Sequence, residues 1–268
     1  MAQKITSAAN PLIKTLKALH TKKGRSETGL FLAEGARSAS EAASLGVWPD
    51  ILLIAEAALA RPQVRTLLER AEAEGVRCVE TSEGLLGQIS KRDNPQTVIG
   101  AYRQRLTPLA SVDCELMIAV EAMRDPGNLG TVLRTADSIG ASGVVQVDGG
   151  CDPFSVEAVR ASMGSIFSTK LARCSLAELQ AHAKANEAMI VGASLNGAPL
   201  QDAWATPERV IVFMGNEQSG LSPAHEEACD MLVKLPMRGR ADSLNVAIAT
   251  AVLGYDIWRR REYEGARA

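Results

Sequence analysis

Three polar segments in the second half of the chain each follow a run of apolar, strand-like residues. They are residues 124–141 (RDPGNLGTVLRTADSIGA), 215–222 (GNEQSGLS) and 235–245 (LPMRGRADSLN). Each combines glycine with side chains that can position a polar ligand, among them arginine, asparagine, glutamate and serine. In open α/β sheets, ligands bind at the carboxyl ends of the strands, so these three segments are the candidate site.

The first segment predicts an amphipathic helix over residues 129–139. On a helical wheel, Val132, Leu133 and Ala136 fall on the same face as Leu129, at about 100° per residue. Arg134 falls well off that face and therefore points to solvent or into a cleft. An ordinary surface arginine explains this pattern equally well.

In the second segment, two glycines allow the backbone to approach a ligand closely, and Glu217 lies in the turn between them. An ordinary loop that ends in a capped helix is the simpler interpretation. A dinucleotide site is a further alternative, but no GxGxxG sequence follows a strand in this chain, which argues against it.

The third segment leads into a long stretch, through Trp258, that is apolar nearly all round. This pattern predicts a helix buried on most sides. Asp242 and Ser243 are typical N-cap residues and predict that the helix begins there. The N-terminal end of a helix carries partial positive charge and unpaired N–H groups, which suit a ligand, although an ordinary core helix fits the pattern too. Its apolar surface exceeds what one short sheet can cover, so part of it is expected in a homodimer interface.

The elements that must position these segments alternate along the whole chain. In the first half we expect strands at residues 29–33, 51–55, 76–80 and 97–103, with helices at 10–23, 36–45, 62–74 and 82–90, which predicts an α/β/α sandwich. In the second half we expect strands at 116–120, 143–147, 170–172, 189–193, 210–214 and 231–235, with helices at 155–166, 176–186 and 223–229. Those buried apolar strands predict a mostly parallel sheet covered on both faces. We place an N-terminal domain at 1–105, a linker at 106–112 and a second domain at 113–268.

Composition limits the function classes. The 268 residues carry a net charge of −2, so the overall charge does not indicate a nucleic-acid partner. Residues 1–25 nevertheless hold six basic residues and no acidic one, which predicts a phosphate-binding surface or simply a solvated helix face. Three distant histidines do not favour zinc, and five scattered cysteines favour free thiols over disulfides. No signal-peptide pattern is found, so a cytoplasmic protein is expected.

In this order, the three segments resemble the SpoU family, also called the TrmH family, of RNA ribose methyltransferases. The matching residues are Asn128-Leu129-Gly130 with Arg134, Gly215-Asn216-Glu217 with Gly220-Leu221-Ser222, and Pro236-Met237 with Ser243-Leu244-Asn245-Val246. RASMG at 160–164 and SLNG at 194–197 also match. The resemblance covers residues 112–260 and extends more loosely to FLAEGAR at 31–37. Gln218, Asp242 and Ala247 depart from residues frequent in the family, but none removes a presumed catalytic group.

The resemblance implies a fold and partners. The C-terminal domain would be a parallel-sheet SPOUT domain with a deep trefoil knot that binds S-adenosylmethionine, and it would form a homodimer. The N-terminal α/β/α domain would resemble ribosomal-protein-like RNA-binding domains. The substrate would be structured RNA, with ribosomal RNA favoured over tRNA because of the appended domain. A catalytically silent RNA-binding or ribosome-assembly protein is the alternative from another class. DNA and membranes are not expected as partners.

The resemblance also implies roles for individual residues. The catalytic residues would be Arg134, Asn128, Glu217, Ser243 and Asn245. The cofactor would be held by Leu195, Gly215, Asn216, Leu235, Met237, Ser243 and Leu244. Arg160 would bind an RNA phosphate, and the basic N-terminal run adds Lys22, Lys23 and Arg25. Methyl transfer mainly requires alignment of the 2′-hydroxyl. The family assigns activation of this hydroxyl to the arginine that matches Arg134. Because arginine stays protonated, the alternative is that Arg134 clamps the adjacent phosphate and leaves proton removal to phosphate or water. A bidentate Glu217–Arg134 pair is a further hypothesis.

Overall fold

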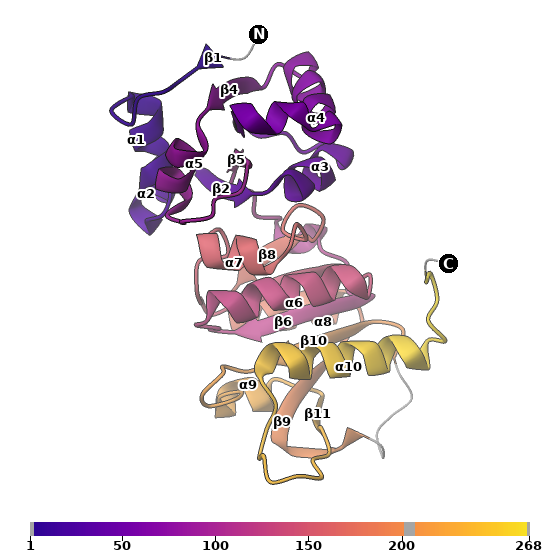
Figure 1. The fold of residues 1–268 in the computed structure, drawn as a ribbon. Helices are drawn as coiled ribbons and strands as arrows, with labels where there is room; N and C mark the ends of the chain where they lie inside the picture. Colours follow the sequence, from indigo (N-terminus) through magenta and orange to yellow (C-terminus); the bar gives the residue numbers. More distant parts are fainter. Residues whose placement is uncertain (1–2, 201–206, 267–268) are drawn as a thin grey trace. The chain divides into compact units, whose positions relative to one another are not determined.

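The computed structural model describes residues 3–200 and 207–266, and the chain forms two compact units (Figure 1). The first unit comprises Met1–Arg105 and Asp152–Ser168, and the second comprises Leu106–Cys151 and Thr169–Ala268. A linear division of the chain did not anticipate that a segment from the second half would cluster with the first. The domain boundaries proposed from the sequence therefore stay a prediction.

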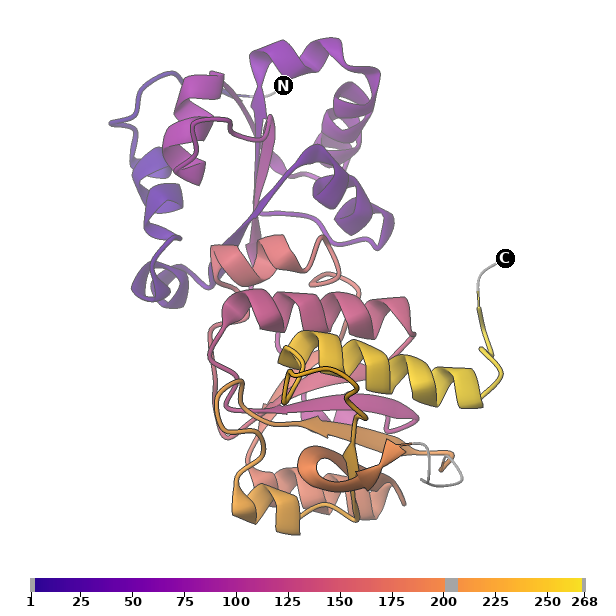
Figure 2. The same ribbon diagram turned by 60° about the horizontal axis from the view of Figure 1, so that its bottom comes forward.

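The first unit is built on a five-stranded mixed sheet. Its strand order is β1 (Gln3–Lys4), β4 (Arg77–Thr81), β3 (Ile51–Ala55), β5 (Val98–Arg103) and β2 (Leu30–Glu34). β5 runs antiparallel to both of its neighbours. The helices are α1 (Pro11–Ala18), α2 (Lys22–Thr28), α3 (Ala36–Ser44), α4 (Pro62–Ala73), α5 (Glu83–Ser90) and α7 (Val156–Ala161). Figure 2 shows α1 and α5 on one side of this sheet and α3 and α4 on the other, as in the predicted sandwich.

Two helices of the first unit differ from the prediction. The single helix expected at 10–23 is two helices, because Thr21 begins a second one by accepting a hydrogen bond from the Gly24 amide. The helix expected at 155–166 ends at Ala161. Met163 and Gly164 adopt φ angles of 52° and 104°, and this left-handed backbone cannot continue an α-helix.

The second unit contains a six-stranded sheet whose paired strands are all parallel, as expected. The order is β11 (Met231–Lys234), β9 (Met189–Pro199), β10 (Val210–Met214), β6 (Leu116–Glu121), β7 (Gly143–Val147) and β8 (Leu171–Cys174). The helices α6 (Pro126–Ser138) and α10 (Val246–Arg260) lie on one face, and α8 (Leu176–Ala185) and α9 (Pro223–Glu227) lie on the other (Figure 2). The knot implied by the family resemblance stays a prediction.

The longest strand, β9, changes register halfway along. Leu232 of β11 pairs with Gly192, but the next residue, Val233, pairs with Ala198. Residues 193–197 therefore arch away from the ladder, and this arch provides one wall of the pocket described below. Gly197 is required in the arch because a Cβ there would overlap the backbone of Leu232 and Val233.

The last helix, α10, begins later than predicted and is less buried. Asn245, rather than Asp242 or Ser243, is its N-cap, and its side chain accepts hydrogen bonds from the Ala247 and Ile248 amides. One face is buried, but Ile248 is 53% exposed, so the expectation of burial on most sides is wrong for this chain. Within the described residues, no helix is long and apolar enough to cross a membrane.

Candidate cofactor pocket and active site

A pocket of about 620 Å³ lies in the second unit, beside the C-terminal ends of β9, β10 and β11. The arch of β9 forms one wall, the 215–222 loop another, and the segment leading into α10 the third. All seven residues predicted to bind a cofactor line it: Leu195, Gly215, Asn216, Leu235, Met237, Ser243 and Leu244. Glu217 and Asn245 line it as well. The pocket thus brings the second and third sequence motifs together, as the parallel-sheet argument predicted.

The lining suits an apolar ring system together with positive charge. Leu195, Leu235, Met237 and Leu244 supply apolar surface. Gly215 packs so closely on Gly220 and Leu221 that a Cβ would overlap their backbone, so the loop backbone itself forms the wall. Among the described lining residues there are two carboxylates and no lysine, arginine or histidine.

One of those carboxylates, Glu226, is held at the pocket wall by the arch of β9. Ser194 donates a short hydrogen bond to Glu226 Oε1, and the Asn196 amide lies 3.3 Å from Oε2. Sequence reasoning did not single out Glu226, since no family motif quoted for this chain contains it. The position of this carboxylate follows from the register shift of β9.

The other carboxylate, Glu217, connects the second motif to the first. Its oxygens accept hydrogen bonds from the backbone amides of Asp125 (3.0 Å) and Arg124 (3.1 Å), and the Asn128 side chain lies 3.4 Å away. Burial raises the pKa of Glu217, but these hydrogen bonds outweigh it and hold the pKa below its usual value. Glu217 is therefore a structural anion at neutral pH.

The Asn128 side chain connects the first motif to the third. Its Oδ1 accepts a hydrogen bond of 3.0 Å from the Asn245 side chain, which in turn caps α10. The Asp125 side chain caps α6 by accepting a hydrogen bond of 2.7 Å from the backbone N–H of Asn128. Three motifs that are far apart in the sequence therefore share one hydrogen-bonded chain, Glu217–Asn128–Asn245.

Arg134 is exposed on α6, as the helical wheel predicted. Within the described part of the chain, its guanidinium makes no hydrogen bond or ion pair. The predicted Glu217–Arg134 pair is wrong: the Glu217 oxygens accept hydrogen bonds from the Arg124 and Asp125 amides, and among the described residues Glu217 forms no ion pair with Arg134. Arg134 and Asn128 do not line the pocket of the predicted cofactor residues. The guanidinium of Arg134 is thus left for a ligand.

A polar network centred on the buried His225, which the sequence did not reveal, holds the end of the 215–222 loop. His225 Nδ1 lies 2.6 Å from Ser222 Oγ and 3.3 Å from Glu121 Oε1, and its Nε2 lies 3.0 Å from Asp148 Oδ2. Glu121 also accepts from the Ser222 amide at 2.9 Å. Glu121 ends β6 and Asp148 follows β7, so the only available signal was a polar residue at the end of each apolar strand.

The residues predicted to bind RNA fall in the first unit. Lys22 and Lys23 are exposed on α2. Arg160 lies on α7, where its guanidinium is 3.2 Å from Glu34. The prediction that Arg25 binds RNA is wrong. Arg25 is only 4% exposed, forms an ion pair of 2.7 Å with Asp152 and donates a hydrogen bond to the Leu19 carbonyl. Its guanidinium is used within the fold, so it cannot contact RNA.

Comparison with known proteins agrees with this geometry. Residues 115–255 match the SpoU rRNA methylase family, and residues 10–100 match the MRM3-like substrate binding domain. The chain is 35% identical to the 23S rRNA (guanosine(2553)-2'-O)-methyltransferase RlmP of Bacillus subtilis, over 95% of this chain and 99% of that protein.

Two solved structures bear on the pocket. The AdoMet-bound rRNA methyltransferase from Sinorhizobium meliloti superimposes with a TM-score of 0.88 at 37% identity, covering 99% of both chains. The SpoU methyltransferase AviRb from Streptomyces viridochromogenes, in complex with the cofactor AdoMet, gives a TM-score of 0.82 at 26% identity, covering 96% of this chain and all of that one.

Proposed function

Because this chain belongs to the SpoU rRNA methylase family, we propose that it methylates a ribose 2′-hydroxyl of ribosomal RNA with S-adenosylmethionine as the methyl donor. The observation that carries the proposal is the pocket in which the second and third motifs meet, with Arg134 of the first motif on α6, where its guanidinium has no hydrogen bond or ion pair with the described residues. A methylase needs both, because it must bind the donor and align the RNA.

The described residues fit the cofactor. When bound, S-adenosylmethionine supplies an electrophilic methyl group on a positively charged sulfur. Leu195, Leu235, Met237 and Leu244 would enclose its adenine, and the backbone of the 215–222 loop would provide polar contacts. Glu217 and Glu226 give the pocket the sign of charge that favours a cation.

We assign the RNA side of the reaction to Arg134. Its guanidinium stays protonated, so it acts by holding the phosphate next to the reacting ribose and by stabilising negative charge on the 2′-oxygen. The hydroxyl proton then leaves to a phosphate oxygen or to water. Asn128, Glu217 and Asn245 are positioning residues, because their contacts fix α6 and α10 relative to the loop. Ser243 lies at the pocket wall, where it can bind the ribose.

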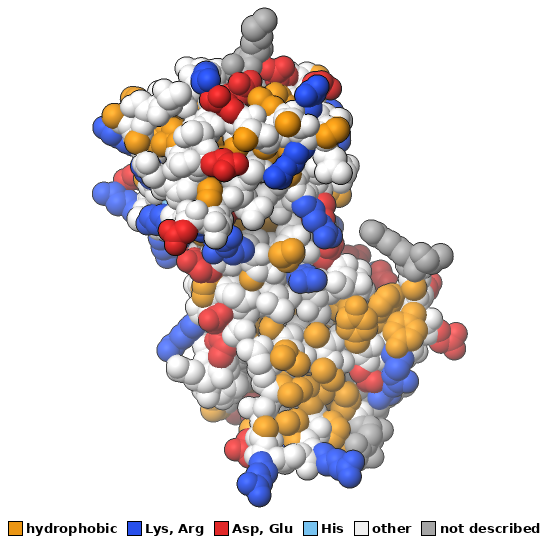
Figure 3. All heavy atoms as spheres, in the orientation of Figure 1, with side chains coloured by type: hydrophobic (Ala, Val, Ile, Leu, Met, Phe, Trp, Pro, Cys, Tyr) orange, Lys and Arg blue, Asp and Glu red, His pale blue; other side chains and the backbone are white. Residues whose placement is uncertain are grey.

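We also propose that the second unit forms a homodimer through α10. Ile248, Val252 and Tyr255 follow each other at helical spacing on its exposed face, and Leu244 and Leu195 are exposed nearby. Figure 3 shows hydrophobic side chains gathered on this face of the second unit. A second copy of the same helix would cover such a patch isologously. We further propose a cytoplasmic location, which the rRNA-modifying relative supports.

The test combines binding with product mapping. Calorimetry with S-adenosylmethionine and S-adenosylhomocysteine should show binding of both. Ribosomal RNA from a deletion strain should then gain one ribose methylation when the purified protein and cofactor are added. If tRNA is methylated and rRNA is not, the substrate is tRNA instead of rRNA. Absence of cofactor binding by folded protein would favour a silent RNA-binding protein and would overturn the proposal.

A further inference from the structure

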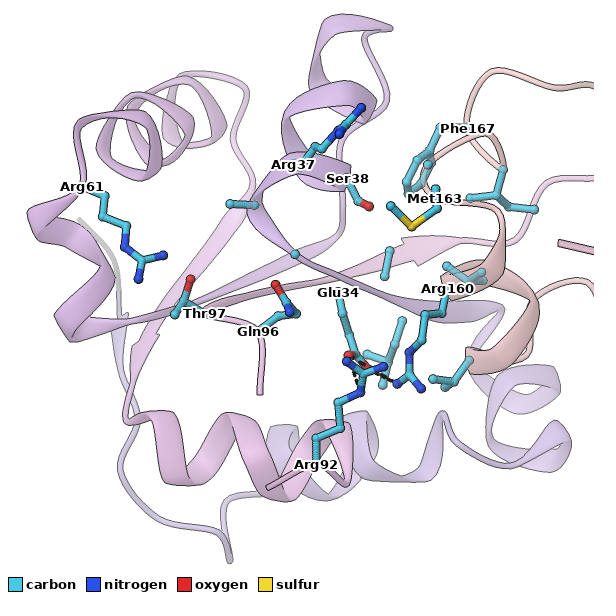
Figure 4. Close-up of a pocket in the computed structure, with 18 residues that line it drawn as sticks. Glu34, Arg37, Ser38, Arg61, Arg92, Gln96, Thr97, Arg160, Met163 and Phe167 are labelled. Carbon is cyan, nitrogen blue, oxygen red and sulfur yellow. Dashed lines mark hydrogen bonds and ion pairs between the residues drawn. The ribbon is translucent and has the colours of Figure 1, made fainter. Parts of the chain in front are cut away.

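The first unit contains a cavity of about 370 Å³ that shares no lining residue with the cofactor pocket (Figure 4). One wall is residues 32–38, where β2 leads into α3. The second comes from Arg92, Gln96 and Thr97, between α5 and β5, and the third from residues of 156–167. Arg61 closes the remaining side. A cavity of this size accommodates a ligand the size of one nucleotide.

The charges lining this cavity favour an anion. Arg37, Arg61, Arg92 and Arg160 line it, against a single acidic residue, Glu34. The Glu34 side chain is only 8% exposed and lies 3.2 Å from Arg160 and 3.6 Å from Arg92. The buried carboxylate thus holds two guanidiniums in place while leaving their other N–H groups available. Figure 4 shows Arg92 and Arg160 converging on Glu34.

The backbone adds to the positive character of one wall. Gly35 is the N-cap of α3, and no side chain caps that helix end. Ala36, Arg37 and Ser38, which form its first turn, line the cavity. Amide groups in the first turn of a helix have no partner within the helix and can bind a phosphate oxygen.

The wall formed by residues 156–167 is apolar apart from Arg160. Phe167, Ile166 and Val159 line it together with Met163, which is 51% exposed and has a φ of 52°. A methionine in the left-handed region is strained, and such strain is concentrated at functional sites. Gln96 carries a primary amide into the same cavity, and in the described structure that amide makes no hydrogen bond. It can both donate to and accept from the edge of a base.

We propose that this cavity binds one unpaired nucleotide of the RNA substrate. Its phosphate lies at Arg92, Arg160 and the first turn of α3, and its base packs on Met163 and Phe167 within reach of Gln96. This inference rests on the proposed function, which makes RNA the partner, and deepens it by naming a recognition site in the first unit. Proteins that read RNA characteristically hold unstacked bases against apolar or aromatic side chains.

The test uses the full chain without cofactor. Fluorescence anisotropy measures the binding of fluorescein-labelled oligoadenylate, oligocytidylate and oligouridylate pentamers, and of an abasic ribose-phosphate pentamer. Arg61→Gln should weaken all four by about threefold to tenfold, because it removes one phosphate-attracting charge. Arg65→Gln is the matched control: it removes the same charge one turn along α4, outside the cavity, and should change binding less than about twofold.

Met163→Gly tests the base contact while relieving the backbone strain, so it should fold at least as well as the parent. We expect about fivefold or greater weakening for at least one base-bearing pentamer and no change for the abasic one. Wild-type protein that binds no pentamer, variants that all bind as wild type, or an abasic pentamer bound as tightly as every base-bearing one would each overturn the assignment.

Parallel assays separate this inference from the proposed function. Each variant is titrated with S-adenosylmethionine, which should bind as to wild type, because the two pockets share no residue. If the wild-type protein methylates rRNA but the Met163→Gly variant binds every pentamer as wild type does, the proposed function stands and the nucleotide site in the cavity is rejected. If Met163→Gly weakens pentamer binding but the wild-type protein transfers no methyl group, the nucleotide site stands and the proposed methyltransferase function is rejected.

Discussion

The side-chain amide of Asn245 donates a hydrogen bond of 3.0 Å to Asn128 Oδ1, across 117 positions of sequence. The same Asn245 caps α10 through its own Oδ1, and Asn128 touches Glu217 through its Nδ2. The Asn245 side chain therefore caps the start of α10 and, at the same time, links α10 to α6, the helix that carries Arg134. This relationship makes Asn245 a positioning residue whose two functions can be separated.

Asn245→Asp should separate them. Aspartate still caps α10, so the free energy of unfolding should change little, but it cannot donate to Asn128, so methyl transfer should fall. Asn245→Ala should lose the cap as well, at a cost of about 1 kcal/mol of stability. Urea denaturation and single-turnover methyl transfer measure the two effects. Full activity of Asn245→Asp would show that the link to Asn128 is unimportant.

Glu217 should make stability depend on pH in one direction. Its pKa is lowered in the folded protein, so its contribution is fully present above the unfolded value of about 4.3 and is lost as pH falls through the folded value. Glu217→Gln removes this titration. The stability difference between wild type and Glu217→Gln, measured by urea denaturation, should be constant from about pH 7 to about pH 6 and shrink toward about pH 3. A difference that grows with acidity would contradict the assigned hydrogen bonds.

Arg134→Ala should reduce the rate of methyl transfer by about a hundredfold or more, because it removes a charge that stabilises the transition state. Stability should change by less than about 0.5 kcal/mol, since Arg134 is exposed and its guanidinium forms no hydrogen bond or ion pair with the described residues. S-adenosylmethionine should bind with unchanged affinity, because Arg134 lies outside the pocket lining. Arg134→Lys, which keeps the charge but loses the fork of donors, should be intermediate.

If Arg134→Ala lowered the affinity for S-adenosylmethionine as much as the rate of methyl transfer, the assignment of Arg134 to the RNA and not to the cofactor would be wrong. Thr131, one turn earlier on α6, offers a matched exposed control. Within the described residues, its hydroxyl donates a hydrogen bond to the Gly127 carbonyl alone, so Thr131→Ala should leave the rate close to that of wild type.

Glu226→Gln should reduce the preference of the pocket for S-adenosylmethionine over S-adenosylhomocysteine. The methyl donor carries a positive sulfur and the product does not, so a nearby carboxylate favours the donor. We expect the ratio of the two dissociation constants to fall by about threefold to tenfold at low salt, and less at high salt. Calorimetric titration with both ligands measures it. An equal change in both constants would mean that Glu226 acts through the shape of the β9 arch instead.

Ile248→Glu should dissociate the proposed homodimer, because it places a charge in the exposed apolar face of α10. Light scattering at micromolar concentration should report the mass of one chain for the variant and of two for wild type. Leu45→Glu, at an exposed apolar position outside this face, is the control and should leave the mass unchanged. A monomeric wild type would reject the dimer directly.

The sequence alone was sufficient to predict the parallel sheet and the residues that line the pocket. The sheet and the location of the site follow from local patterns, namely apolar runs of strand length with polar segments directly after them, whereas the individual pocket residues were implied by the resemblance to the SpoU family. Parallel strands end at a common edge, so the residues that follow Met214 or Lys234 meet without further information. The exposure of Arg134 followed in the same way from helical periodicity.

The tertiary structure decided which polar groups form hydrogen bonds and ion pairs with one another. Asp242, Ser243 and Asn245 are all good caps, and only the packing of α10 selects Asn245. The sequence was compatible with a Glu217–Arg134 pair, but in the fold the Glu217 oxygens face nearby backbone amides instead. Arg25 belongs to a basic run that the sequence predicts to be solvated, yet it is buried and paired with Asp152. Hydrogen bonds and ion pairs act over a few ångströms, so they depend on which distant segments meet, and no local pattern records that.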